Sequence, residues 1–267
     1  MRRVPAPRSC AVVAALAVSA IGLSSAATDL TGKVVVSDEF REALAEAEKA
    51  EAKSRESCYW NEPNGLIPVR PPLVDPSADL GMALYREGAP APEPDELFTV
   101  KVRAGGLARS LVLTRPGSTI RFDNVSPFDH ELYVPGFDGF EPQRQARGNF
   151  RPIAFGEEKS YEVRCKLQPH FRGWVVATPA TEIVNLKKNG AFEVEDLEPG
   201  NYKLKVFHGG RCVHEQDVEV ADAKRMEIEV KLSAPEPSEG SEQEGEEGEE
   251  DGDEGEEKAG EKAEGGK

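Results

Sequence analysis

The sequence predicts a mainly β protein with an antiparallel β-sandwich, a small second β-sandwich, one N-terminal helix and a disordered acidic tail. Short runs that alternate apolar and polar residues fill positions 95–233, and Gly- and Pro-rich turns separate them. Such period-two alternation is typical of half-buried strands in antiparallel sheets. A run rich in Ala, Glu, Lys and Arg at 39–56 predicts the helix, and acidic residues dominate 234–267.

Residues 1–27 have the pattern of a secretory signal peptide. Arg2, Arg3 and Arg8 precede an uncharged apolar run at 11–23, which is too short to span a bilayer, and small residues follow it. We expect the signal to be cleaved and the mature chain, without a membrane span, to be periplasmic or secreted. An N-terminal membrane anchor is the alternative. Cys10 lies before the apolar run, which is the wrong place for a lipid-modified cysteine.

The acidic tail at 234–267 holds 15 Asp or Glu and 3 Lys, and it accounts for most of the net charge of −16. It has no aliphatic or aromatic residue larger than Ala, so it cannot bury enough apolar surface to offset the entropy of ordering. The rest of the chain has no basic stripe with interleaved aromatic residues. A nucleic-acid partner is therefore not expected.

The region before the sandwich, 28–94, combines three kinds of local structure. Residues 32–36 read as a short strand, and the helix at 39–56 has a thin apolar face made of Phe40, Leu44 and alanines. We expect this helix to rest lightly on the body. Prolines are frequent from 62 to 94, which predicts an irregular segment that wraps the protein.

Two clusters of alternating runs follow, at 95–178 and 179–233. In the first, Tyr161, Val163 and Cys165 share one face of a strand, and in the second, Asn189–Gly190 is a strong turn signal. The second cluster, with roughly 55 residues, is small for an independent core. It is expected to pack on the first cluster or to borrow the strand at 32–36.

The stretch from 103 to 178 resembles the cupredoxin family of blue copper proteins, which includes azurin and plastocyanin. The resemblance rests on the segment from Ser118 to Asn124, the region of His130, and the segment 165–176, which follow in the family's order. Residues 189–206 resemble a carboxypeptidase-regulatory-like, or transthyretin-like, domain. The two resemblances cover about half of the chain. They imply a Greek-key sandwich, a copper cofactor and electron transfer with a redox partner protein.

A trigonal copper site in this family takes one thiolate and two imidazoles, and the sequence offers them in two registers. In the first register, Gln168 occupies the position of the second His ligand and Phe171 that of the Met ligand. Only two of the family's ligands, His130 and Cys165, are then present. In the second, four residues separate Cys165 from His170, as in azurin. His130, Cys165 and His170 then complete the set, and Gln168 could supply a weak axial oxygen.

The alternative to a copper protein is a metal-free cupredoxin scaffold that acts as an envelope or secreted binding or structural module. Its partner would be another envelope component. No enzyme is expected, because Asp129 and Glu131 flank His130 without a nucleophile. His208 and His214 fit no ligand pattern.

Three of the four cysteines, Cys58, Cys165 and Cys212, follow the signal peptide. An oxidising compartment would allow disulfides, and an odd number leaves one thiol over. If Cys165 is kept as a ligand or buried thiol, Cys58 and Cys212 are the expected disulfide pair.

Overall fold

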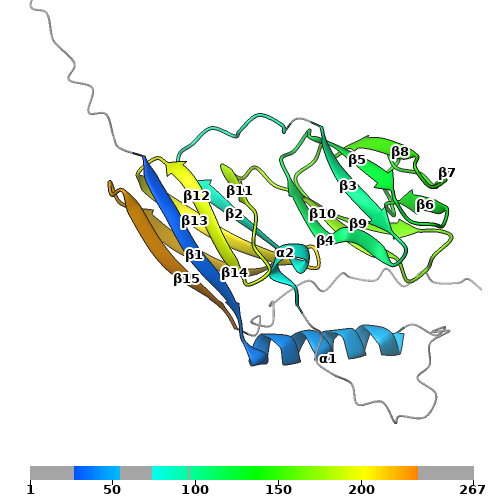
Figure 1. Ribbon diagram of the computed structural model, residues 1–267, viewed down its shortest axis with the longest axis horizontal. Coiled ribbons are helices and arrows are strands. Elements are labelled where there is room, and N and C mark those ends of the chain that lie inside the picture. Colours follow the sequence, from blue (N-terminus) through cyan, green and yellow to red (C-terminus); the bar gives the residue numbers. More distant parts are fainter. Residues whose placement is uncertain (1–26, 55–73, 96, 234–267) are drawn as a thin grey trace, which may run out of the picture. The chain divides into compact units, whose positions relative to one another are not determined.

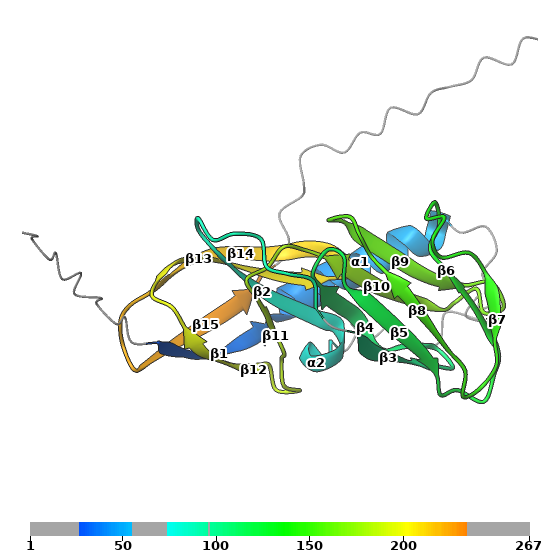
Figure 2. The same cartoon turned by 90° about the horizontal axis from the view of Figure 1, so that it is seen from above.

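A computed structural model describes residues 27–54, 74–95 and 97–233, with side chains left undescribed at 47–54. The predictions for the signal peptide, for Cys58 and for the acidic tail lie outside these residues. Strands make up most of the described chain, which confirms the mainly β class, and two helices accompany them (Figures 1 and 2). Neither helix has the length and apolar character needed to cross a membrane.

Seven strands form the sheets of the second sandwich. Three make one sheet: β12 (Ala191–Leu197), β1 (Thr28–Val36) and β15 (Arg225–Leu232). Four make the other: β11 (Glu182–Val184), β2 (Leu80–Arg86), β13 (Gly200–His208) and β14 (Arg211–Val220). Aliphatic side chains of both sheets share one core, in which Leu30, Leu84 and Leu204 are fully buried.

Strand β1 begins at Thr28, four residues before the predicted start, and it completes the sheet of the C-terminal strands. It pairs antiparallel with β12 and parallel with β15. Leu30 and Val34 on its inner face are buried in the core. The C-terminal strands thus pair with a strand from the other end of the chain. They also pack on the larger sheet through Phe207, so both expected arrangements occur together.

Helix α1 (Asp38–Ser54) follows β1 directly and confirms the predicted N-terminal helix. The hydroxyl of Ser37 accepts a hydrogen bond from the backbone N–H of Phe40 at 3.1 Å, which caps the first turn. Phe40 is fully buried, and its ring meets that of His208 edge-on at 6.0 Å. One aromatic side chain therefore anchors a helix whose apolar face is otherwise thin.

The prediction of an irregular segment throughout 62–94 is wrong at its centre. The short helix α2 (Pro76–Asp79) leads into β2, which lies between β11 and β13. Asp75 caps α2 by accepting a hydrogen bond from the N–H of Ser77 at 2.9 Å. The prolines are confined to the flanks of β2, so they do not interrupt its pairing.

Strand β2 was missed because it is buried on both faces and shows no alternation. Met82 and Leu84 enter the core of the second sandwich. Ala83, on the opposite face, belongs to a separate cluster with Leu111 and Val176 of the larger sheet. A strand that packs between two apolar layers has a continuous apolar sequence without alternation. Because prolines flank this run on both sides, the sequence suggested a loop.

Eight strands form the larger sheet, in the order β7-β6-β9-β10-β4-β3-β5-β8. Their bounds are β3 (Phe98–Arg103), β4 (Gly106–Thr114), β5 (Thr119–Asn124), β6 (His130–Tyr133), β7 (Gln143–Gln145), β8 (Phe150–Ala154), β9 (Ser160–Cys165) and β10 (Arg172–Ala177). The two edge strands, β7 and β8, are consecutive in the chain. Because a short loop joins them, the sheet curls until its edges face each other.

The larger sheet is mixed and not purely antiparallel. Strand β3 pairs antiparallel with β4 but parallel with β5, and β10 pairs parallel with β4. Strand β5 follows β4 in the chain yet lies beside β3, so it reaches its place by an arch and not by a hairpin. These two parallel pairings correct the purely antiparallel arrangement that the sequence predicts. Alternation reports one buried face of a strand and does not fix the direction of its neighbours.

Candidate functional site

His130 and Cys165 lie at neighbouring strand ends inside the larger sheet. His130 begins β6, Cys165 ends β9, and the two strands pair antiparallel with Leu132 opposite Cys165. His130 and Leu132 point to the same face because side chains alternate along a strand. Both site residues are buried, His130 at 0% and Cys165 at 2% exposure. The pairing thus brings the predicted imidazole and thiol together in the core.

The polar atoms of this pair contact each other. Nδ1 of His130 lies 3.6 Å from Sγ of Cys165, and the backbone N–H of Glu131 donates to the same sulfur at 3.4 Å. Burial lowers the pKa of the His130 imidazole, against a weaker opposing effect of the Asp129 carboxylate. The imidazole is therefore neutral at pH 7, with one ring nitrogen that donates and one that accepts.

The hydrogen bond at Nε2 of His130 determines which tautomer of the imidazole is favoured. Nε2 of His130 lies 2.8 Å from Oγ of Ser126, and this hydroxyl lies 2.9 Å from the acceptor Oδ1 of Asn124. When the Ser126 hydroxyl donates to Asn124, it accepts from N–H at Nε2 of His130. The lone pair of the imidazole is then on Nδ1 and faces the sulfur of Cys165.

Ser126 belongs to a buried network of polar side chains that the sequence reasoning missed. The amide of Asn124 donates to the carbonyls of Phe128 and Gln145, each at 2.8 Å. The amide of Gln145 donates to the carbonyl of Phe122 at 2.7 Å and to that of Asn149 at 2.8 Å.

A signal for part of this network is present in the sequence. Asn124 ends a strand two residues before Ser126, and its Oδ1 accepts the N–H of Ser126 at 3.0 Å. This contact forms an Asx turn, in which Asn folds its side chain onto the following backbone.

The loop between β9 and β10 holds the remaining predicted ligands. The N–H of Phe171 donates to the carbonyl of Gln168 at 2.9 Å, which closes a turn with Pro169 and His170 at its centre. His170 is exposed at this position. In the part of the chain that the structure describes, no group of three or more His, Cys, Asp or Glu side chains could hold a metal ion. His170 is thus not brought together with His130 and Cys165.

Two other side chains of the loop face inward. Phe171 is fully buried, and its ring centroid lies 5.3 Å from that of His130. Gln168 is half-buried, and its Oε1 is enclosed without a hydrogen-bond partner among the described residues. Residues 168 and 171 are those that the first register aligns with the second His and with Met.

The donors can be tested against the needs of a copper ion. Bonds of about 2.0 Å to nitrogen and 2.3 Å to sulfur, opened at about 120°, would set these atoms about 3.7 Å apart. The separation of 3.6 Å between Nδ1 of His130 and Sγ of Cys165 satisfies this condition, and it equally suits an S–H···N contact. The second imidazole is missing, and an amide oxygen is a poor replacement for it. The donor set therefore does not fit a trigonal copper site.

The other predicted residues lie apart from this pair. His208 contacts Phe40, and Nε2 of His214 lies 3.0 Å from Oε1 of Gln216. Cys212 is exposed and Cys165 buried, and no disulfide joins the described cysteines. The predicted partner of Cys212, Cys58, is not among the described residues, so that pairing stays a prediction.

Several solved structures are similar to part of this chain. The purple cupredoxin from Nitrosopumilus maritimus is 18% identical, with a TM-score of 0.28, over 30% of this chain and 98% of that one. Amicyanin from Paracoccus versutus is 19% identical, with a TM-score of 0.28, over 36% of this chain and 98% of that one. A copper-containing nitrite reductase from Thermus scotoductus is 23% identical, with a TM-score of 0.28, over 34% of this chain and 24% of that one. No protein-family model and no curated protein matches the sequence.

Proposed function

We propose that this chain is an exported binding or structural module, built on a cupredoxin-like sheet, that carries no resident copper ion. In this proposal it acts in the cell envelope or outside the cell, with another envelope component as its partner. The pair formed by His130 and Cys165 stabilises the core of the larger sheet. The basic residues Arg2, Arg3 and Arg8, the apolar run at 11–23 and the small residues after it support the export part of the proposal.

The arrangement of the β9–β10 loop is the observation that carries the metal-free part of this proposal. The turn from Gln168 to Phe171 exposes His170 and buries Phe171 against the ring of His130. For His170 to bind a metal ion beside His130, this turn would have to invert. The inversion would expose Phe171, which is now fully buried. Exposing a Phe side chain costs roughly 1.5–3 kcal/mol.

A copper-binding electron carrier is the second candidate, and two observations favour it. The nitrogen and sulfur of His130 and Cys165 have a separation that suits a shared metal ion, and Oε1 of Gln168 is buried without a described partner. In that case His130 and Cys165 would hold the ion with Gln168 beside it, and a redox protein would be the partner.

Copper titration of the mature chain separates the two candidates. We expect no intense visible absorption from the wild type with Cu(II), because two donors do not complete the trigonal set. Gln168→His should create the band, since it restores the second imidazole at the position where the first register needs it. His170→Ala is the matched control and should change nothing. An intense band in the wild type that Cys165→Ala removes would overturn the proposal.

A further inference from the structure

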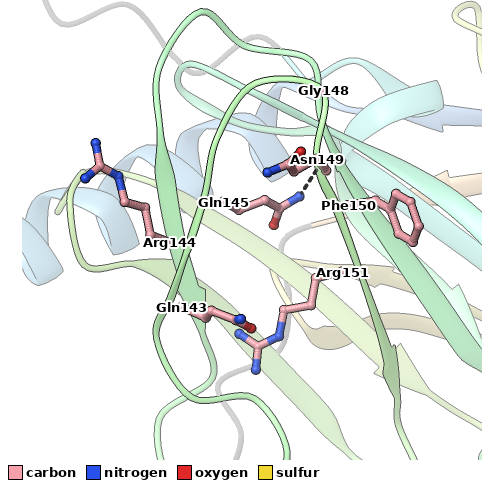
Figure 3. Close-up of a pocket in the computed structure, with 7 residues that line it drawn as sticks. All are labelled: Gln143, Arg144, Gln145, Gly148, Asn149, Phe150 and Arg151. Carbon is pink, nitrogen blue, oxygen red and sulfur yellow. Dashed lines mark hydrogen bonds between the residues drawn. The ribbon is translucent and has the colours of Figure 1, made fainter.

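A pocket of about 270 Å³ lies where the two edges of the larger sheet face each other. Strand β7, the loop at 146–149 and the first residues of β8 line it, and we call it the seam pocket (Figure 3). Small-ligand pockets have volumes of about 300–1,000 Å³, so this space is close to the lower end of that range.

The inner wall of the seam pocket is fixed by hydrogen bonds. Gln145 is 5% exposed, and its amide is held by the carbonyls of Phe122 and Asn149 (Figure 3 shows the second of these bonds). The N–H of Gly148 donates to the carbonyl of Asn124 at 2.7 Å, which ties down the loop. A wall of this kind is preorganised, so a ligand would not have to order it on binding.

Arg151 provides a positioned positive charge. Its Nη1 donates to the carbonyl of Glu141 at 2.5 Å, and its guanidinium lies 4.8 Å from the centroid of the Phe140 ring. The hydrogen bond uses one of the five N–H donors of the guanidinium. Burial lowers the pKa of Arg151, with a weaker opposing effect from Glu141, but an arginine remains protonated at pH 7. The guanidinium thus stays in place as a charged donor.

The chain segment that lines the seam pocket is basic, whereas the chain as a whole is acidic. The segment from Gln143 to Arg151 contains Arg144, Arg147 and Arg151 but no acid, in a chain with a net charge of −16. Arg144 is paired with Asp129 at 2.5 Å. Of the two arginines in the lining, Arg151 directs its guanidinium toward the space and Arg144 points away from it, and no lining residue is an acid. Such a lining favours an anionic ligand.

The side chains that converge on the space are polar and planar. In Figure 3 the side chains of Gln143 and Arg151 approach each other, and Phe150 and Arg144 point away from the space between the strands. Amide groups both donate and accept hydrogen bonds, so they suit hydroxyl groups of a ligand. A guanidinium beside them suits a carboxylate, which it can bind with two parallel hydrogen bonds.

We infer that the seam pocket binds a small ligand with one carboxylate and several hydroxyl groups, of the class of a hexuronate sugar. Arg151 would bind the carboxylate, and the amides of Gln143 and Asn149 would bind hydroxyl groups. This inference rests on the proposed function and gives the binding module a ligand class. It does not involve His130, Cys165 or the loop between β9 and β10.

A titration of ¹⁵N-labelled protein with glucuronate tests the inference, with glucose and N-acetylglycine as comparison ligands. We expect glucuronate to shift the amide signals of Gly148, Asn149 and Arg151 in a saturable way, and glucose and N-acetylglycine to bind at least tenfold more weakly. Arg151→Gln should weaken glucuronate binding about tenfold or more, because a charge-assisted hydrogen bond is worth about 1.5–3 kcal/mol and 1.4 kcal/mol is tenfold. Gln143→Ala should weaken it about two- to tenfold, because a hydrogen bond between neutral groups is worth about 0.5–1.5 kcal/mol. Arg147→Gln is the matched control, since it removes an equal charge from the adjoining loop, at a residue outside the pocket lining.

Three results would overturn the inference. The first is no saturable shift with glucuronate, the second is glucose or N-acetylglycine binding as tightly as glucuronate, and the third is Arg147→Gln weakening binding as much as the pocket variants. Gln143 is exposed, so its variant tests the site even if Arg151→Gln proves unstable. Copper uptake by the wild type would contradict the proposed function and leave these titrations unaffected. The two failures are therefore distinguishable.

Discussion

The imidazole of His130 is held at both ends, with Nδ1 3.6 Å from Sγ of Cys165 and Nε2 2.8 Å from Oγ of Ser126. Burying a histidine between two polar neighbours costs little free energy, because both ring nitrogens keep hydrogen-bond partners. The pair is therefore compatible with a stable core without a metal ion. The hydroxyl of Ser126 is the link between this pair and the buried amides of Asn124 and Gln145.

Removing that hydroxyl should destabilise the larger sheet. Ser126→Ala leaves Nε2 of His130 without its hydrogen-bond partner in a buried place, and an unsatisfied buried group costs about 1–3 kcal/mol. Oδ1 of Asn124 keeps the backbone N–H of residue 126. We expect the free energy of unfolding, measured by urea denaturation, to fall by about that amount. Thr99→Ala removes a hydroxyl from an exposed strand position and should change it by less than about 0.5 kcal/mol. Equal losses in the two variants would show that the network contributes nothing.

Acid should destabilise the fold through two histidines, the buried His130 and the half-buried His208. Burial lowers the pKa of His130 and of His208 below the ordinary value of 6.5, with weaker opposing effects of Asp129 and Asp79. The unfolded chain then binds protons at a higher pH than the folded chain does. The contribution of these groups is fully present above pH 6.5 and is lost as the pH falls through and below that value.

Urea denaturation at pH 7.5, 6.5 and 5.5 measures this loss. His208→Gln removes one of the two groups while every carboxylate stays, so the stability of this variant should fall less steeply with decreasing pH than that of the wild type. Identical slopes for the two proteins would contradict the assignment to His208.

The turn between β13 and β14 contains two glycines that should respond differently to the same substitution. Gly209 and Gly210 both have positive φ, 54° and 77°, so Ala at either position costs roughly 1–2 kcal/mol in backbone strain. A Cβ at Gly210 would overlap the indole ring of Trp174 in β10, whereas a Cβ at Gly209 would meet open space. Gly210→Ala should therefore cost a further 1–3 kcal/mol or so, as overpacking does.

Thermal unfolding of the two variants compares them directly. A melting temperature for Gly210→Ala no lower than that for Gly209→Ala would show that the contact with Trp174 is not tight. The comparison also tests the packing of the β13–β14 turn on the larger sheet, where the hydroxyl of Ser160 donates to the carbonyl of Gly210.

The predictable elements were those with one face in the core and one in water. Tyr161, Val163 and Cys165 alternate with polar residues, so β9 and the inward direction of Cys165 followed from the sequence. Strand β2 has apolar neighbours on both faces and lacks that signal. The parallel pairing of β3 with β5 could also not be predicted from the sequence, because it depends on how the chain crosses from β4 to β5.

The candidate site was predictable in part for a similar reason. Strand ends fix His130 and Cys165, so counting along the strands placed both residues correctly inside the sheet. The position of His170 depends instead on the turn from Gln168 to Phe171, and spacing alone does not determine which side of a turn faces inward. Ser126 sits in a Ser-Pro turn, where polar residues are usually exposed, and its burial results from tertiary contacts.

The pairing of β1 with β12 and β15 has a consequence for the order of events during synthesis. Residues 28–36 leave the ribosome long before residues 191–232, so β1 must wait for its partners while more than half of the chain is made. Its backbone N–H and C=O groups stay unpaired during this time, which makes it a site for wrong pairing with other chains. The second sandwich can close only after translation has reached its last strand, whereas every strand of the larger sheet is available earlier. A chaperone that holds the early strand would therefore benefit this sandwich more than the sheet that contains His130 and Cys165.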